Sequence, residues 1–386
     1  MIAYNNTWLG NLFIQRESDE AYHENCLAKE EWENIKVKYP VHFYTPNFFI
    51  RIGLFLLTAI ILVFSFGLFT LLFMSSIEHA IGGLAIFFAL LAYTALEYMV
   101  QTKKHYQSGV DDALLWISAA TMYAGIYFAT HPGNIAACAI IFIISVYCSL
   151  RFTDAVMSIV AFISLLCICF FICAEAGSTT KTFVPFILMA VSFLIYFFTM
   201  KVKGLQSVRY YAQCLNMIEI AALLSFYLAG NYFAVRELSD SMFHLNLAAN
   251  ESIPFGWLFW LFTTIIPVLY LLRGIQKKDA VLLRVGLLLI AVIIFTVRYY
   301  HSVAPVEIMM TLGGIGLIGL SYVLIRYLRE PRHGFTYKET RPAHAIDKLQ
   351  IESLILAETF AGQPAPPDTT SFGGGSFGGG GASGEY

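Results

Sequence analysis

Charged side chains interrupt the long apolar stretches of this sequence at only a few positions. A charge in the apolar core of a membrane costs roughly 2.5–3.5 kcal/mol on an insertion scale, so charges retained there usually have partners. A buried carboxylate can also take up and release a proton, which is the chemistry of many ion and solute pathways. The charged positions are Arg51, Glu97, Glu219, Arg284, Arg298 and Glu307.

The deepest of these acids suggests a candidate polar site. Glu219 and Arg284 occupy similar depths in their apolar stretches, and Asn216 precedes Glu219 by about one helical turn. One interpretation is a polar pathway or pocket lined by Glu219, Asn216 and Arg284. The other is that Arg284 extends to the membrane interface and that Glu219 is paired only for packing. The sequence leaves both interpretations open.

The remaining charges form candidate structural ion pairs at matched depths. Arg51 and Glu97 both lie within about one turn of the same end of their stretches, and Arg298 and Glu307 flank a short aromatic turn. Pairing Arg51 with Glu97 and Arg298 with Glu307 would leave little unpaired charge in lipid, and unpaired buried charge is strongly destabilising.

The composition identifies the elements that must position these charges. The chain has 386 residues, of which 58% are hydrophobic and 13% charged, whereas a soluble protein carries about 25% charged residues. The apolar sequence lies between residues 47 and 327, and about twenty apolar residues cross a bilayer. We therefore predict an all-α, polytopic transmembrane helix bundle of about ten spans. The expected spans are about 48–74, 79–100, 111–129, 133–150, 154–174, 182–200, 210–230, 254–273, 280–299 and 303–326.

Polar segments flank the apolar region on both sides. Residues 1–46 form an N-terminal segment in which Ala28, Trp32, Ile35 and Tyr39 share one helix face, which predicts an amphipathic helix. Residues 328–362 predict a short amphipathic helix over 345–360. Residues 363–386 are rich in Pro, Gly and Ser, cannot bury a core and are predicted to be disordered.

Lysine and arginine are distributed unequally between the connections, and this bias predicts orientation. One set of alternate connections is basic, whereas the other carries only Lys181 and Arg236, with Arg298 at a helix end. Both termini belong to the basic set. We therefore expect a multi-pass membrane protein with both termini in the cytoplasm. The basic set is Lys103, Lys104, Arg151, Lys201, Lys203, Arg209, Arg273, Lys277 and Lys278.

The sequence contains no catalytic motif, neither a Gly-x-Ser-x-Gly elbow nor a His-Glu-x-x-His zinc helix. All nine histidines fall in loops, tails or helix ends, which argues against axial ligands for a membrane haem. Asp111 and Asp112 start a span, where acids complement the helix dipole. We therefore expect no enzyme activity, no metal, no cofactor and no nucleic-acid partner. The oligomeric state is left open.

Local patterns resemble a known group of proteins. The stretch from Tyr39 to Gly53, the sequence Phe295–Tyr300 and the Gly-rich last span resemble bacterial predicted multi-pass membrane proteins of a domain-of-unknown-function family. This resemblance implies an architecture and no reaction, and Arg298 matches an aromatic-flanked arginine of that family. The Gly-rich tail, Ser371–Gly384, is similar to tails of other bacterial membrane-anchored proteins, although the ending Glu385-Tyr386 departs from their pattern.

These features favour two functions. The first is a scaffold or assembly subunit of the cell envelope that contacts lipid and meets protein partners through residues 333–386. The alternative is a secondary transporter or permease for a small solute, using intramembrane Glu219 and Arg284. A third interpretation, a lipid-modifying membrane enzyme, depends only on the polar outer loop with Glu237, Asp240 and His244.

Overall fold

The computed structural model describes residues 2–23, 25–72, 77–243 and 253–300, together with scattered positions between 311 and 326. All of these belong to the first of two compact units, residues 1–340; the second unit, residues 341–386, lies outside the described residues. The described chain is helical, and its β pairing is one isolated bridge between Tyr44 and His105. The elements are α1 (Asn6–His23), α2 (Lys29–Lys38), α3 (Phe48–Leu72), α4 (Ile77–Gln101), α5 (Val110–Thr130), α6 (Asn134–Phe152), α7 (Ala155–Glu175), α8 (Ser178–Lys203), η2 (Gln206–Tyr211), α9 (Ala212–Gly230), α10 (Tyr232–Phe243), α11 (Gly256–Lys277) and α12 (Ala280–Tyr300).

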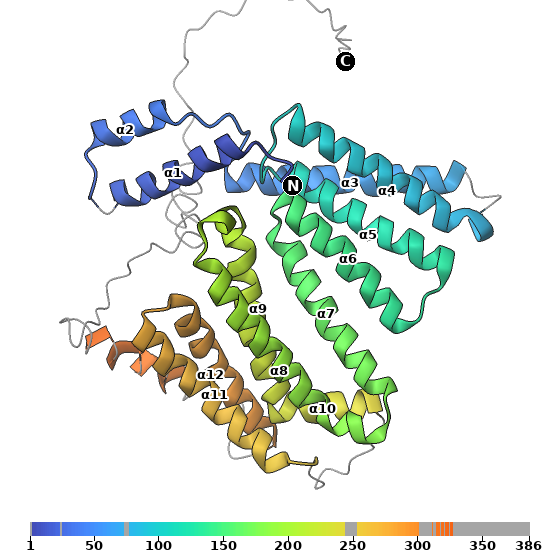
Figure 1. Cartoon of the computed structure of the whole chain (residues 1–386), viewed down its shortest axis with the longest axis vertical. Helices are drawn as coiled ribbons and strands as arrows, with labels where there is room; N and C mark the ends of the chain where they lie inside the picture. The colour runs from blue at the N-terminus through green and yellow to red at the C-terminus, as the bar shows by residue number, and fades with distance from the viewer. Residues whose placement is uncertain are drawn as a thin grey trace, which may run out of the picture. The chain divides into compact units, whose positions relative to one another are not determined.

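In this part of the chain, nine helices are long and apolar enough to cross a membrane, namely α3 to α9, α11 and α12 (Figure 1). The predicted all-α transmembrane bundle is therefore confirmed. Many large apolar side chains stay exposed on these helices, and α3 buries none of its residues. Such surfaces suit contact with membrane lipid. The expected tenth span, 303–326, lies mostly outside the described residues, as do the predicted helix at 345–360 and the Gly-rich tail.

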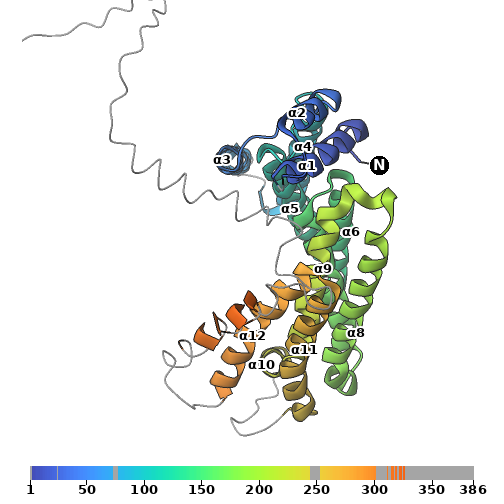
Figure 2. The same ribbon diagram turned by 90° about the vertical axis from the view of Figure 1, so that its left-hand side faces the viewer.

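Helices that follow one another in the chain form the closest pairs, which are α4–α5, α6–α7, α8–α9 and α11–α12 (Figure 1). Glycines allow the closest of these approaches: a Cβ atom at Gly125 on α5 would lie 2.8 Å from the backbone nitrogen of Ile86 on α4. Small residues at such crossings are typical of membrane helices. Further contacts join α7, α11 and α12 to α9, and α10 lies beside α11 (Figure 2).

The N-terminal segment differs from the expected single amphipathic helix, because α1 and α2 form a helical hairpin. The indole of Trp32 on α2 stacks on Tyr22 at 4.9 Å between ring centroids, and its Nε1 donates a 2.6 Å hydrogen bond to Asp19. The backbone nitrogen of Ala28 donates to the side chain of Glu31, which helps α2 begin as a new helix. The apolar stripe around Trp32 therefore packs on α1.

The first residues of the chain anchor this hairpin to the bundle. The amide of Ala3 donates a 2.8 Å hydrogen bond to the carbonyl of Arg151 at the end of α6. Tyr4 is buried in the largest core cluster, together with Leu96, Tyr106 and Phe152. The N-terminal segment therefore lies at the bundle end that holds the α4–α5 and α6–α7 connections. These connections belong to the basic set found in the sequence.

Candidate functional site

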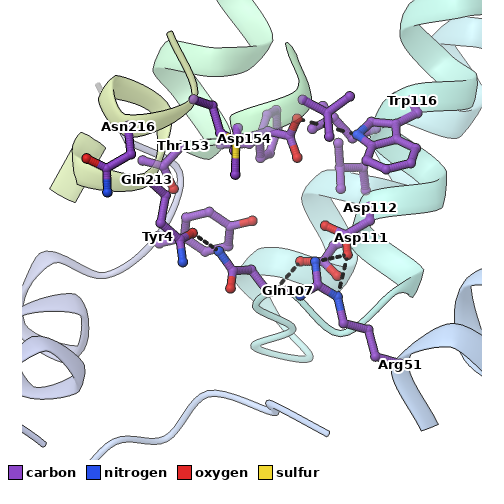
Figure 3. Close-up of a pocket in the computed structure, with 16 residues that line it drawn as sticks. Tyr4, Arg51, Gln107, Asp111, Asp112, Trp116, Thr153, Asp154, Gln213 and Asn216 are labelled. Atoms are coloured by element: carbon purple, nitrogen blue, oxygen red, sulfur yellow. Dashed lines mark hydrogen bonds and ion pairs between the residues drawn. The ribbon is translucent and has the colours of Figure 1, made fainter. Parts of the chain in front are cut away.

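A cavity of about 320 Å³ opens at this basic end of the bundle (Figure 3). It lies where α3, α5, α7 and α9 begin and where α4 and α6 end. Figure 3 shows Arg51, Asp112 and Trp116 on one side of it and Gln213 and Asn216 on the other. The lining consists of Tyr4, Arg51, Leu96, Gln107, Asp111, Asp112, Leu115, Trp116, Phe152, Thr153, Asp154, Ala155, Val156, Gln213, Asn216 and Met217.

Asp111 closes the loop that precedes α5. Its Oδ1 accepts hydrogen bonds of 2.8 Å from the backbone nitrogen and the hydroxyl of Ser108, and its Oδ2 accepts one of 2.8 Å from the backbone nitrogen of Gln107. The side chain is buried, so these donors replace water. Burial and the negative charge of Asp111 also raise the pKa of Tyr4 well above its ordinary value, which keeps the Tyr4 phenol neutral. Both groups are therefore fixed parts of the wall.

Arg51 fastens the start of α3 to the start of α5. Its Nη2 and Nε donate hydrogen bonds of 2.7 and 3.0 Å to the same oxygen of Asp112, Oδ2. The backbone also makes close contact here, since a Cβ atom at Gly109 would lie 2.1 Å from the carbonyl oxygen of Arg51. Gly109 has φ of +92°, a conformation that favours glycine. Charge and backbone packing together hold α3 at the cavity.

The expected pairing of Arg51 with Glu97 is wrong. Glu97 on α4 instead pairs with Arg151 at the end of α6, with 2.6 Å between Oε1 and Nε. The hydroxyl of Tyr93 donates to the same oxygen at 2.7 Å, and Gln101 donates to the other at 2.7 Å. The depths of Arg51 and Glu97 do match, but equal depth does not make residues on different helices neighbours.

Asp154 is a carboxylate of the cavity wall whose hydrogen-bond donors are all neutral, as are those of Asp111. It caps α7 by accepting a 2.7 Å hydrogen bond from the backbone nitrogen of Met157, and the indole of Trp116 donates to the same oxygen at 3.4 Å. Burial raises the pKa of Asp154 above its ordinary value, and these hydrogen bonds offset only part of the increase. Carboxyl groups with raised pKa values in cavities are frequent at functional sites.

The residues of the predicted polar site do not form one site. Asn216 lines the cavity, whereas Glu219 forms an ion pair with Lys203 at the end of α8. Arg284 is exposed on α12. Asn216 and Glu219 lie about one helical turn apart along α9, but Asn216 borders the cavity and Glu219 meets the end of α8. α9 therefore contributes one residue of the predicted site to the cavity wall and another to a separate buried ion pair.

The second predicted ion pair cannot be compared with the structure, because Glu307 lies outside the described residues. Arg298 is half-buried near the end of α12, and its Nε has no hydrogen-bond partner among the described residues. His244 also lies outside the described residues, and Glu237 and Asp240 belong to α10.

Sequence reasoning missed the partners that define this end of the bundle. From the sequence, Asp112 indicates only a residue that complements the helix dipole, and Arg151 and Lys203 belong to the basic connections. One signal was available: an aspartate that starts a span at the same end as an intramembrane arginine has the right depth and charge to pair with it. The sequence does not tell which of several such acids is the neighbour.

The described residues contain no group of three or more His, Cys, Asp or Glu side chains placed to hold a metal ion. Comparisons with protein-family models, curated proteins and solved structures find no match to this chain.

Proposed function

We propose that this chain is a small-solute permease and that the cavity at the basic end of the helices is its solute site. The observation that carries this proposal is the cavity itself, whose volume of about 320 Å³ falls in the range of roughly 300–1,000 Å³ typical of small-molecule sites. Its lining combines aromatic and aliphatic side chains with charged, amide and hydroxyl groups that could orient a solute.

The charges of the lining favour a cationic solute. Arg51 is the positive side chain of the lining, and Asp111, Asp112 and Asp154 are the negative ones. The oxygens of Asp111 are occupied by loop donors, and Arg51 compensates Asp112. Asp154 is left with neutral hydrogen-bond donors, so a cation in the cavity would supply the missing counter-charge.

Trp116 favours an organic cation over a bare metal ion. It lies one helical turn beyond Asp112 on α5, and its indole borders the cavity while its Nε1 binds Asp154. An aromatic face next to a carboxylate is a suitable environment for an ammonium group. The amides of Gln213 and Asn216 on the opposite wall can donate to or accept from the rest of such a solute.

The proposed location is the bacterial cytoplasmic membrane, with the cavity open toward the cytoplasm. The bias of lysine and arginine toward one set of connections supports this orientation. The packing of the N-terminal segment on the same end of the bundle agrees with it, because the chain start and the basic connections then share one side.

Thermal unfolding of the purified full-length chain in detergent tests the solute site. A panel of primary amines, diamines and quaternary ammonium compounds is compared with neutral alcohols of similar size. We expect one or more cations to raise the unfolding temperature of the wild type and not of Asp154→Asn, which removes the charge but keeps a side chain able to cap α7.

Asp279→Asn is the matched control, because Asp279 also caps a helix, α12, and does not line the cavity. It should keep the full response to the cation. Stabilisation by cations that survives in Asp154→Asn, or a panel in which no cation stabilises the wild type, would contradict the proposal.

A scaffold role, with protein partners bound through residues 333–386, stays a prediction. Those residues lie outside the described part of the chain, and no feature of the described residues favours this role over solute binding. Truncation after Arg332 separates the two functions. A permease should keep its response to cations in unfolding experiments, whereas a scaffold should lose its stable protein associations.

A further inference from the structure

Glu219 is the most deeply buried charged residue among the described parts of the chain. Its exposed fraction is 1%, and its surroundings on α9 include the buried Ala222, Leu223 and Tyr227. Its Oε2 accepts a hydrogen bond from the Lys203 ammonium, which is also its ion-pair partner. Its Oε1 is buried and has no hydrogen-bond partner among the described residues. The carboxylate is therefore only half satisfied.

The other charged and titratable groups near Glu219 do not complete its shell. Tyr196 on α8, Arg273 on α11 and Asp279 at the start of α12 belong to the same electrostatic neighbourhood, and Asp279 adds a second negative charge. On α12, Arg284 is exposed. On α7, the only charged residue is Glu175 at its far end, and the charged residues of α10 lie beyond the far end of α9.

A half-satisfied carboxylate in an apolar environment has two ways to lower its energy. It can keep a cation against it, as Lys203 does here, or it can bind a proton and become neutral. A proton on Oε1 would remove the uncompensated negative charge at the atom that lacks a partner.

Lys203 is placed so that its ammonium can move away from Glu219 when Glu219 binds a proton. It is the last residue of α8, its side chain is 23% exposed, and its ammonium is carried on a flexible chain. Its neighbour Lys201 is exposed at the same helix end, over the ring of Phe197. The Lys203 ammonium therefore has a short route to the aqueous side.

We propose that Glu219 is a proton-binding site at which a proton and the Lys203 ammonium alternate as the counter-charge. In the step, one proton from the aqueous phase binds Oε1, the hydrogen bond from Lys203 to Oε2 breaks, and the ammonium keeps its own protons and moves toward water. The protein gains one positive charge. Deprotonation reverses the exchange.

If the chain is the proposed permease, α9 links this site to the solute cavity. The same helix carries Gln213, Asn216 and Met217 in the cavity wall and Glu219 in the buried pair. Exchange at Glu219 is then the step that couples proton binding to solute occupancy.

Infrared difference spectroscopy of the full-length chain in lipid nanodiscs tests the proton site without any solute. On acidification we expect a C=O stretching band of a protonated carboxylic acid that is missing from the spectrum of Glu219→Gln. The control is Glu97→Gln, which removes the carboxylate of the Arg151 pair at the membrane end and should keep the band. Identical difference spectra for the wild type and Glu219→Gln would overturn the proposal.

Chemical labelling of lysines provides a second test, whose decisive comparison is made on the wild type at different pH values. An amine-acylating reagent is applied at several pH values, and mass spectrometry gives the labelling of Lys203 relative to Lys201, which corrects for the pH dependence of the reagent. We expect this ratio to rise severalfold on acidification and to be high at all pH values in Glu219→Gln. A ratio that stays constant with pH in the wild type would contradict the exchange, even if the cavity binds cations as proposed.

Discussion

The ion pairs at the cavity end and the Lys203–Glu219 pair differ in how completely their carboxylates are hydrogen-bonded. At the cavity end, Glu97 accepts hydrogen bonds from Arg151, Tyr93 and Gln101, and its side chain is 18% exposed. Glu219 has a single partner, one oxygen is orphaned, and its side chain is 2% exposed. The first arrangement holds a charge in one state, whereas the second leaves a charge that can be neutralised.

The physical reason is access to water and to donors. Charges interact more strongly and are harder to solvate away from water, so an incompletely paired carboxylate is far more costly deep in a helix bundle than at its end. The cavity end also has free backbone amides, which Asp111 uses in the loop before α5 and Asp154 uses at the start of α7. Glu219, in mid-helix, has no such donors.

The largest expected effect comes from removing the partner of Glu219. Lys203→Met should lower the stability of the chain by about 3 kcal/mol near neutral pH, because it strands a buried carboxylate. The loss should shrink as the pH falls and Glu219 takes up a proton. Unfolding temperatures of the variant and the wild type across pH measure both effects. A loss of stability of equal size at all pH values would mean that Glu219 does not take up a proton, and the proposed difference from the ion pairs at the cavity end would be wrong.

Gly109→Ala tests how much the close backbone contact between α3 and the start of α5 contributes to stability. A side chain at this position meets the carbonyl of Arg51 and requires φ of +92°, which together should cost about 2 kcal/mol or more. Gly83→Ala on α4 is the control, since a Cβ there meets no atom within 4 Å, and it should be neutral or slightly stabilising. Equal unfolding temperatures for the two variants would show that α3 is not held at Gly109.

Glu97→Gln tests the fully satisfied pair. Because Glu97 and Arg151 are partly exposed and hydrogen-bonded at the bundle end, we expect a loss of about 1 kcal/mol that changes little with pH near neutrality. The exposed pair of Lys29 and Glu33 on α2 provides the reference, and Glu33→Gln should leave the unfolding temperature unchanged. A loss of stability for Glu97→Gln as large as that of Lys203→Met would mean that the two ion pairs do not differ in the way proposed.

The smallest effect is expected for Asp154→Asn. Burial raises the pKa of Asp154, so the native state binds more protons than the unfolded chain between the ordinary aspartate pKa of about 3.9 and the raised native value. Stability from this group is therefore full below that window and is lost as the pH rises through it. Asp154→Asn should raise the unfolding temperature slightly at neutral pH and not in acid. A slightly lower unfolding temperature at neutral pH would mean that Asp154 is stabilised as an anion.

The sequence by itself determined the class of fold, because the apolar stretches required for a bilayer are long and continuous. The predicted spans from 48–74 to 280–299 correspond to α3 to α9, α11 and α12. It also determined which charges are rare enough to matter, including Glu219. These are properties of single segments, and hydropathy and helix length report on single segments.

Only the tertiary structure decided which charges meet. Arg51 binds Asp112, Glu97 binds Arg151 and Glu219 binds Lys203. The α1–α2 hairpin and the cavity likewise arise from packing between segments far apart in the chain. Depth along a helix follows from the sequence, but the direction in which each helix faces and the neighbour it meets follow from side-chain packing across the whole bundle.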